Sequence, residues 1–190
     1  MKKIKKTVLV VALMLGTLVS YANGTLTFSG NEAKIELKDV KKGHRIYIKD
    51  SQNQILYKKT IKKEGVFTKN FNFSSLKDGV YYLEVVKDFE IITSPFLMKS
   101  GVSYFNKEKE KTTFKPSIRI KDNKVFVSKL NLDSSKIKVK IYYMGYEILN
   151  EEVSGKTILN RIYLLNKKYS GEYSIAVSTN NRTYSSSFSM

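Results

Sequence analysis

Apolar and polar residues alternate with a period of two along most of the chain. The pattern is clear in residues 34–38, 45–49 and 71–73, and it returns in residues 118–127 and 137–141. Because successive side chains of a β-strand point to opposite faces, this period predicts short strands with one buried face. β-Branched and aromatic residues dominate these runs, and the polar breaks between them predict turns. The pattern therefore predicts an all-β protein with a sandwich architecture.

A repeat with an offset of 92 residues runs through the chain. Asp-Gly-Val-Tyr-Tyr-Leu-Glu-Val at residues 78–85 corresponds to Ser-Gly-Glu-Tyr-Ser-Ile-Ala-Val at residues 170–177. Phe-Leu-Met at residues 96–98 corresponds in the same way to Phe-Ser-Met at residues 188–190. Solenoid repeats are shorter, at roughly 20–50 residues, so a repeat of this length is a small domain. The repeat predicts two tandem β-sandwich domains.

The repeat also places the domain boundaries. We expect the first domain at residues 25–98 and the second at residues 117–190, with a charged linker at residues 99–116. The expected linker contains the run of residues 107–111, in which lysine and glutamate alternate. Domains of this size have small cores. Because the chain contains no cysteine, each core has to hold its domain without disulfides.

The first 22 residues have the features of a secretory signal peptide. Lysines at positions 2, 3, 5 and 6 precede an almost unbroken apolar run at residues 8–19, and Ser20 and Ala22 are small residues suited to cleavage. We expect cleavage after Ala22 and export to the periplasm, the outer surface or the medium. A transmembrane anchor is the alternative, but the run is shorter than the roughly 20 apolar residues of a membrane span. We therefore expect no anchor.

The chain is strongly basic, which bears on its partners. It has 34 Lys and Arg against 17 Asp and Glu, and loss of the leader lysines lowers the formal net charge from +17 to +13. Basic proteins are attracted to nucleic acids, acidic glycans and anionic lipid surfaces. Few of the basic residues are arginines, which make the bidentate contacts of specific nucleic-acid recognition. We expect an anionic envelope component, a glycan or a protein as the partner, and no specific nucleic acid.

The sequence offers few residues for catalysis. Cysteine is absent and His44 is the one histidine, so neither a Cys–His pair nor a two-histidine metal site can form within this sequence. We expect His44 in a turn or on the surface, and the 17 carboxylates, which stand beside lysines, in solvent. We accordingly expect no catalytic residue, metal or cofactor. An envelope enzyme with two carboxylates across a cleft is the alternative.

A Gly-x-Tyr motif occurs at residues 79–81 and again at residues 171–173. In β-sandwiches, such a tyrosine hydroxyl bonds to the backbone a few residues upstream and fixes a loop between the sheets, an arrangement called a tyrosine corner. We expect a structural role for both copies of the motif. The four residues concerned are Gly79, Tyr81, Gly171 and Tyr173.

The strongest binding candidate is an aromatic turn in the second repeat. Tyr142, Tyr143, Met144 and Tyr146 surround a predicted hairpin turn, whereas the equivalent residues 49–53 of the first repeat are all polar. Tyrosine and methionine are favoured at interfaces. We expect these four side chains to form a binding patch. The alternative is that they pack on a neighbouring loop or on the other domain.

Several segments together resemble a known family of exported proteins. In the second repeat they are residues 139–142, 147–151 and 170–175, and in the first they are residues 46–48, 54–57 and 76–81. These segments resemble small exported immunoglobulin-like proteins of unknown function, and equally the C-terminal sorting domain of type IX secretion cargo. The resemblance implies two tandem immunoglobulin-like β-sandwich domains.

Two departures from the sorting domains decide between these resemblances. A sorting domain stands once behind a large cargo and closes with a basic strand, whereas this chain has two copies and ends with Ser-Ser-Ser-Phe-Ser-Met at residues 185–190. We therefore expect an exported, non-enzymatic binding or structural protein of the bacterial envelope. The alternative is a secretion substrate whose C-terminal domain acts as the sorting signal.

Cell fractionation separates these two functions. A tagged full-length protein is compared with a variant that lacks residues 117–190. For a binding or structural protein of the envelope, we expect both proteins in the same compartment. A full-length protein in the medium or on the outer surface, with the truncated variant held in the periplasm, would establish the sorting function instead.

Overall fold

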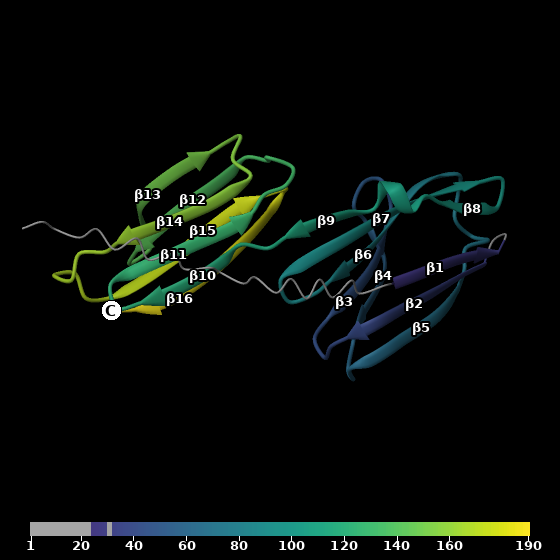
Figure 1. The fold of residues 1–190 in the computed structure, drawn as a ribbon, viewed down its shortest axis with the longest axis horizontal. Helices are drawn as coiled ribbons and strands as arrows, with labels where there is room; N and C mark the ends of the chain where they lie inside the picture. The colour runs from purple at the N-terminus through teal and green to yellow at the C-terminus, as the bar shows by residue number, and fades with distance from the viewer. Residues whose placement is uncertain (1–23, 30–31) are drawn as a thin grey trace, which may run out of the picture.

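The computed structural model describes residues 24–29 and 32–190, which form sixteen β-strands and one short 3₁₀ helix. The protein is therefore all-β, as the alternating pattern predicts. The predicted signal peptide at residues 1–22 lies outside the described residues. Within the described part, the structure contains no helix long and apolar enough to cross a membrane. Figure 1 shows two groups of strands arranged end to end, which we call the first half and the second half.

The first half contains nine strands in two sheets. The strands are β1 (Gly24–Ser29), β2 (Glu32–Val40), β3 (Arg45–Lys49), β4 (Ile55–Thr60), β5 (Gly65–Asn72), β6 (Gly79–Val86), β7 (Glu90–Lys99), β8 (Val102–Phe105) and β9 (Lys111–Phe114). One sheet has the order β1-β2-β5, and the other has the order β4-β3-β6-β7-β8, with β9 also paired to β7. Inward side chains of both sheets, among them Ile35, Ile46 and Leu83, form a single core.

The second half contains seven strands in two sheets. The strands are β10 (Ser117–Lys121), β11 (Lys124–Leu130), β12 (Ile137–Tyr143), β13 (Tyr146–Val153), β14 (Ile158–Leu164), β15 (Glu172–Thr179) and β16 (Arg182–Ser189). The sheet orders are β10-β11-β14 and β13-β12-β15-β16. A second core, which includes Val127, Ile141 and Ile175, lies between these sheets.

The strand orders of the two halves agree. Seven strands of the first half and the seven strands of the second follow the same path, β1-β2-β5 with β4-β3-β6-β7 against β10-β11-β14 with β13-β12-β15-β16. The strand register agrees as well, because Tyr81 is paired with Phe96 and Tyr173 with Phe188. Both members of the second pair lie 92 residues beyond those of the first, so the offset found in the sequence is preserved in three dimensions.

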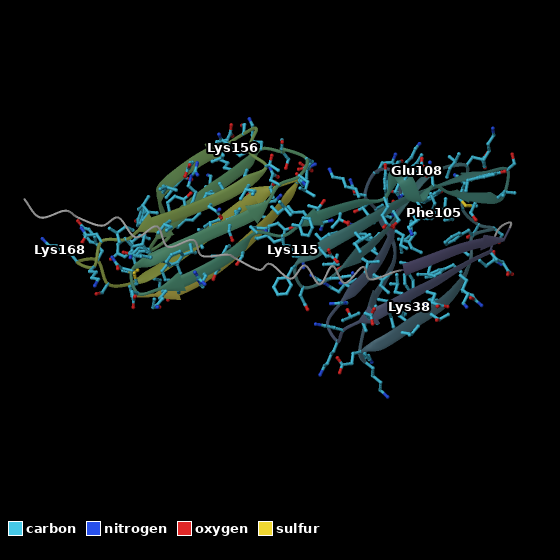
Figure 2. All side chains as sticks on the ribbon, viewed as in Figure 1. Lys38, Phe105, Glu108, Lys115, Lys156 and Lys168 are labelled. Atoms are coloured by element: carbon cyan, nitrogen blue, oxygen red, sulfur yellow. The ribbon has the colours of Figure 1, made fainter. Side chains whose placement is uncertain are left out.

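The segment predicted as a charged linker has a different structure. Within residues 99–116, β8 and β9 pair with β7, and the 3₁₀ helix Lys107–Lys109 lies between them. The short runs on both sides of the charged residues form β8 and β9. Ser103 on β8 is buried. Only Lys115 and Pro116 separate β9 from β10, and Figure 2 shows Lys115 at the junction of the two halves.

In both Gly-x-Tyr motifs, the tyrosine hydroxyl donates a hydrogen bond to a backbone carbonyl oxygen. The Tyr81 hydroxyl donates a hydrogen bond of 2.9 Å to the Lys77 carbonyl oxygen, and the Tyr173 hydroxyl donates one of 2.9 Å to that of Tyr169. Each bond joins the start of a strand to the loop four residues upstream. Gly171 is also sterically constrained, because a Cβ atom there would lie 3.1 Å from side-chain atoms of Met144 and Tyr143.

Removing either hydroxyl should destabilise its half of the molecule. We expect Tyr81→Phe and Tyr173→Phe each to lower the free energy of unfolding by about 1 kcal/mol, because each leaves a carbonyl oxygen without its donor. Urea denaturation measures the change. Tyr104→Phe is the control, since Tyr104 is exposed and should change stability little. An equal effect of all three substitutions would contradict a structural role for the two bonds.

Candidate functional site

The aromatic turn of the second half is only partly available as a binding patch. The turn between β12 and β13 consists of Met144 and Gly145, whose φ angles of 49° and 84° suit a tight hairpin. The Tyr143 hydroxyl donates a 3.0 Å hydrogen bond to the Ser170 carbonyl oxygen, and the Tyr143 ring lies 4.9 Å from that of Tyr173. Tyr143 therefore packs on a neighbouring loop, which is the alternative that the sequence left open.

The other three candidates in this turn differ in exposure. The Met144 sulfur lies 3.4 Å from the Glu172 backbone nitrogen, although more than half of the side chain is exposed. Tyr142 is half-buried, and Tyr146 is 77% exposed. Tyr143 and Met144 thus lie against residues 170–172, and Tyr146 is the most exposed of the four predicted side chains.

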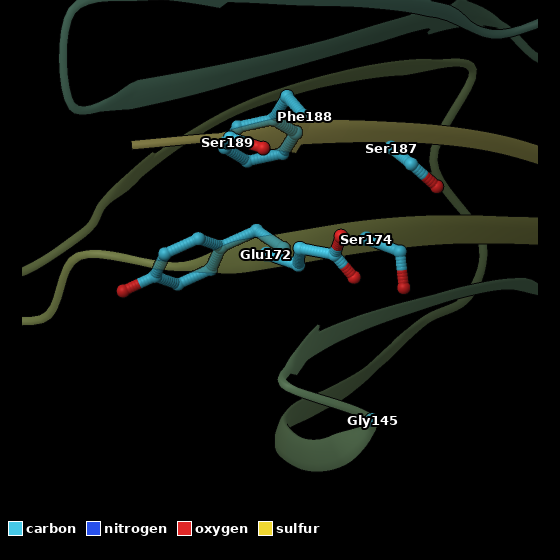
Figure 3. Close-up of a pocket in the computed structure, with 7 residues that line it drawn as sticks. Gly145, Glu172, Ser174, Ser187, Phe188 and Ser189 are labelled. Carbon is cyan, nitrogen blue, oxygen red and sulfur yellow. The ribbon is translucent and has the colours of Figure 1, made fainter.

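A cavity lies beside this turn. Its volume is about 460 Å³, and Figure 3 shows it between the turn and the ends of β15 and β16. The residues that line it are Gly145, Glu172, Tyr173, Ser174, Ser187, Phe188 and Ser189. None of the four predicted binding side chains is among them. Three serines, two aromatic rings and the Glu172 carboxylate line this cavity, and no cation is among the lining residues.

A second cavity, the inter-half cleft, is formed by residues of both halves. Its volume is about 280 Å³. The lining residues are Lys49, Ser51, Asn53, Tyr82, Glu84, Ile91, Thr93, Lys111, Thr113, Asn180 and Arg182. They come from β3, the turn after it, β6, β7 and β9 in the first half, and from the turn between β15 and β16 in the second. The cleft is thus a site that neither half forms alone.

The turn between β15 and β16 positions the residues of the second half that line the cleft. The turn between β15 and β16 is Asn180–Asn181, and both residues have positive φ angles, of 50° and 56°. Asparagine tolerates this left-handed conformation better than most residues. The tight turn directs Arg182, the first residue of β16, toward the sheet of the first half, where it meets Glu84.

Glu84 is the centre of the cleft. It lies on β6 between the inward-pointing Leu83 and Val85, and it is only 5% exposed. One carboxylate oxygen, Oε2, accepts hydrogen bonds from Lys49 Nζ at 3.0 Å and from the Arg182 guanidinium. The other oxygen, Oε1, is buried and has no hydrogen-bond partner among the described residues. The expectation that all carboxylates lie in solvent is therefore wrong for Glu84.

A second ion pair joins the halves near the rim of the cleft. Lys111 Nζ on β9 donates to Asp133 Oδ2 at 2.6 Å, and Asn180 Nδ2 donates to the same oxygen at 3.1 Å. The hydrogen bond from Lys111 holds the pKa of the Asp133 carboxyl well below its usual range. Asp133 therefore stays ionised through neutral and mildly acidic pH, and the contact between β9 and the second half persists there.

Positive charge exceeds negative charge around the cleft. Lys49, Lys111 and Arg182 line it, against the carboxylate of Glu84. Lys115 lies close by, and its pKa is lowered by burial and by the neighbouring charges of Arg45 and Arg182. Burial raises the pKa of Tyr184, with the Glu84 charge adding to the effect. A small anion would therefore find a favourable potential at this site.

His44 lies outside this cleft and is more buried than the sequence predicts. It is 4% exposed, its Nδ1 accepts a 3.1 Å hydrogen bond from the Lys41 backbone N–H, and its Nε2 lies 3.6 Å from Asp88 Oδ2. Burial lowers the pKa of the imidazole, which favours its neutral form. His44 closes a turn, as expected, because its backbone N–H donates a 3.1 Å hydrogen bond to the Lys41 carbonyl oxygen, but its side chain is buried and not on the surface. Within the described ranges, no group of three or more His, Cys, Asp or Glu residues could hold a metal ion.

Sequence reasoning missed the residues that form the inter-half cleft. One signal was present, because Glu84 interrupts the otherwise apolar run of residues 83–86. A second signal lies in the repeat itself, since the residue equivalent to Glu84 is Ala176 and the residue equivalent to Arg182 is Glu90. The contact between the two halves joins residues that are far apart in the sequence, so the alternation of side chains within one strand does not predict it.

Comparisons with known proteins do not identify a relative. No family model matches the chain. A comparison with curated proteins finds no match. Among solved structures, the human OSCAR ligand-binding domain is similar over 88% of this chain and 97% of that chain, with a TM-score of 0.25 and 10% sequence identity. A likeness with so low a TM-score carries no argument about this protein.

Loss of the Arg182 charge should weaken the junction of the halves. We expect Arg182→Gln to lower the free energy of unfolding by about 1–2 kcal/mol, because Glu84 stays buried with Lys49 as its remaining cationic partner. Urea denaturation measures this loss. Lys136→Gln is the matched control, since the Lys136–Glu152 pair is exposed and such pairs contribute about 0–1 kcal/mol. Equal losses in both variants would contradict the role of Arg182.

Proposed function

We propose that this protein is an exported, non-enzymatic binding protein of the bacterial envelope, built from two tandem immunoglobulin-like β-sandwich domains. We further propose that the inter-half cleft holds an anionic, hydroxyl-bearing ligand, namely an acidic sugar unit of an envelope glycan. The observation that carries the proposal is the gathering of Lys49, Lys111 and Arg182 in a cleft that is otherwise lined largely by neutral hydroxyl and amide side chains.

The two-domain organisation is supported by the separate cores and the shared strand order of the halves. In immunoglobulin constant-type domains, the fourth strand belongs to the sheet of the first strand. In both halves of this chain, the fourth strand, β4 or β13, pairs instead with the third. We therefore propose a variant of the immunoglobulin-like sandwich in which this edge strand has changed sheet.

The chemistry of the cleft supports an acidic sugar. Ser51, Thr93 and Thr113 line the cleft with hydroxyl groups, which can donate hydrogen bonds to sugar hydroxyls and accept hydrogen bonds from them. Lys49 and Arg182 have further N–H donors that can bind an anionic group of the same ligand. A uronic acid carries hydroxyls and a carboxylate on one ring, so it can satisfy both requirements together.

The volume of the cleft limits the size of the ligand, and its lining residues determine which groups of the ligand can be bound. Ligand pockets in proteins commonly have volumes of roughly 300–1,000 Å³, so a cleft of about 280 Å³ suits one sugar unit or the end of a chain. Thr93, Thr113 and Asn53 line it and add neutral hydrogen-bonding groups. The rim of the cleft can therefore bind sugar hydroxyls in any of several orientations.

A binding function is favoured over hydrolysis by the number of carboxylates in the cleft. Glycoside hydrolysis needs two carboxyl groups on either side of the scissile bond. Glu84 is the one carboxylate that lines the cleft, and it is already paired with two cations. Asp133 near the rim is held by Lys111. These contacts support a role in recognition.

Glucuronate and glucose are the matched probes for this proposal, because they differ only in the carboxylate. We expect glucuronate to bind in an NMR titration and glucose to bind at least tenfold more weakly. Glu84→Gln should weaken glucuronate binding at least tenfold, because the carboxylate that holds Lys49 and Arg182 in place in the cleft is lost. Glu152→Gln removes the same charge from an exposed ion pair and should have no effect.

The same titrations can refute the proposal. Tighter glucuronate binding by the Glu84→Gln variant would show simple attraction of an anion to a basic surface. Failure of the wild-type protein to bind glucuronate would exclude acidic sugars of this type. Equal binding of glucose and glucuronate would show that the negative charge of the ligand does not contribute to binding.

A further inference from the structure

The outer face of the sheet β10-β11-β14 carries exposed aliphatic side chains. On β14, Ile158, Ile162 and Leu164 are 60%, 64% and 71% exposed, and they alternate with the inward-pointing Leu159 and with Tyr163, which packs on the core. β14 lies at the edge of the sheet. Isolated exposed aliphatic residues are common on protein surfaces, but β14 carries three on one face, with Asn160 between Ile158 and Ile162.

Cations occupy the other side of the same face. Arg119 and Lys121 on β10 and Lys124 on β11 point outward, because the residues between them face the core. The strand register sets Lys121 opposite Lys124 and Lys124 opposite Leu164. The outward positions of these three strands, all of them described, hold no acidic side chain. The face is therefore cationic along β10 and aliphatic along β14.

An aromatic side chain joins the two sides of the face. Phe126 on β11 lies between Arg119 and Ile162 in the register, and the Arg119 guanidinium lies 5.0 Å from the centre of the Phe126 ring. Lys156 and Lys168, which precede and follow β14 in the sequence, are exposed and lie well apart on the second half (Figure 2). Cations thus stand along one side of the aliphatic row and beyond both of its ends.

The first half shows that the fold does not require such a face. With the offset of 92 residues, Asn70 and Asn72 of β5 are the equivalents of Ile162 and Leu164. Glu32 of β2 stands in the place of Lys124. The same strands in the first half therefore present polar and acidic groups at positions where the second half presents aliphatic and basic ones.

We propose that this face, which we call the β14 face, docks on the surface of a bilayer rich in anionic phospholipid. The aliphatic row enters the boundary between head groups and acyl chains, while Arg119, Lys121 and Lys124 bind phosphate groups. An anionic bilayer offers negative charge and an apolar layer in one plane, which matches a face with cations beside aliphatic side chains and no acidic group. The docking uses no residue of the inter-half cleft, so it stands independently of the proposed sugar binding.

Vesicle flotation tests the proposal. The protein used is residues 23–190, which contain every described strand and lack the apolar run of residues 8–19 that would bind lipid by itself. We expect binding to vesicles of phosphatidylglycerol and phosphatidylcholine, and at least tenfold weaker binding to phosphatidylcholine alone. Binding should also fall as salt is raised, because the head-group contacts are ionic.

Substitutions that copy residues from the equivalent positions of the first half identify the binding face. Ile162→Asn with Leu164→Asn introduces the residues found at the equivalent positions 70 and 72, so the fold should tolerate the change. We expect this variant to lose at least tenfold in vesicle binding. Lys124→Glu, which introduces the residue found at position 32, should lose binding to a similar extent. Ile55→Asn with Leu56→Asn removes exposed aliphatic residues of β4 and should bind vesicles normally.

Three outcomes would overturn the proposal. Absence of wild-type binding to the anionic vesicles excludes a lipid surface as the partner of the β14 face. Equal loss in the β4 control and in the β14 variant shows that no single face is responsible. A wild-type protein that is dimeric in sedimentation, and becomes monomeric on Ile162→Asn with Leu164→Asn while vesicle binding is unchanged, shows that a second copy covers the face.

Discussion

The arrangement of the two halves depends on one buried carboxylate. Glu84 is almost completely removed from solvent, and an ionised group in such a place is stable only when it is paired and hydrogen-bonded. Lys49 from the same half and Arg182 from the other provide that pairing. Because Arg182 can reach Glu84 only when the Asn180–Asn181 turn lies against β6, this interaction selects the placement of the second half. The inter-half cleft exists as a consequence.

Desolvation offsets much of the attraction within a buried ion pair, whereas removal of one partner leaves an uncompensated buried charge. This explains why a polar contact can define the junction while two apolar cores stabilise the halves. The repeat makes the point directly. Most core positions of both copies are aliphatic or aromatic, although the buried Lys129 stands in the place of Leu37. Outward positions have diverged further, with Ala176 in the place of Glu84 and Asn70 in the place of Ile162. The features we associate with binding all lie at these outward positions.

The sequence predicted those parts of the structure that depend on local patterns. The alternation of apolar residues predicted the strands, and the offset of 92 residues predicted the matching register of Tyr81 and Tyr173. It did not predict that residues 102–105 and 111–114 pair with β7, because their strand pattern is too short to outweigh the charged run between them. The burial of Glu84 and of the His44 side chain, and the choice between the two environments left open for Tyr143, were beyond the sequence for a different reason. Their burial depends on neighbours more than 20 residues away in the sequence, for which no periodicity gives a signal.

The inter-half cleft and the β14 face differ in what they require of the fold. The face is carried by three strands of a single sheet, so it remains intact if the halves separate. The cleft needs both halves held in register, and the contacts that hold them, Glu84–Arg182 and Lys111–Asp133, are polar. Salt screens exposed charge pairs far more than buried ones, so the Lys111–Asp133 pair, whose lysine side chain is 57% exposed, is the more salt-sensitive of the two contacts. An anionic ligand in the cleft would bind Lys49 and Arg182, the two cations that Glu84 already binds. Because these cations belong to different halves, such a ligand would add a second link across the junction.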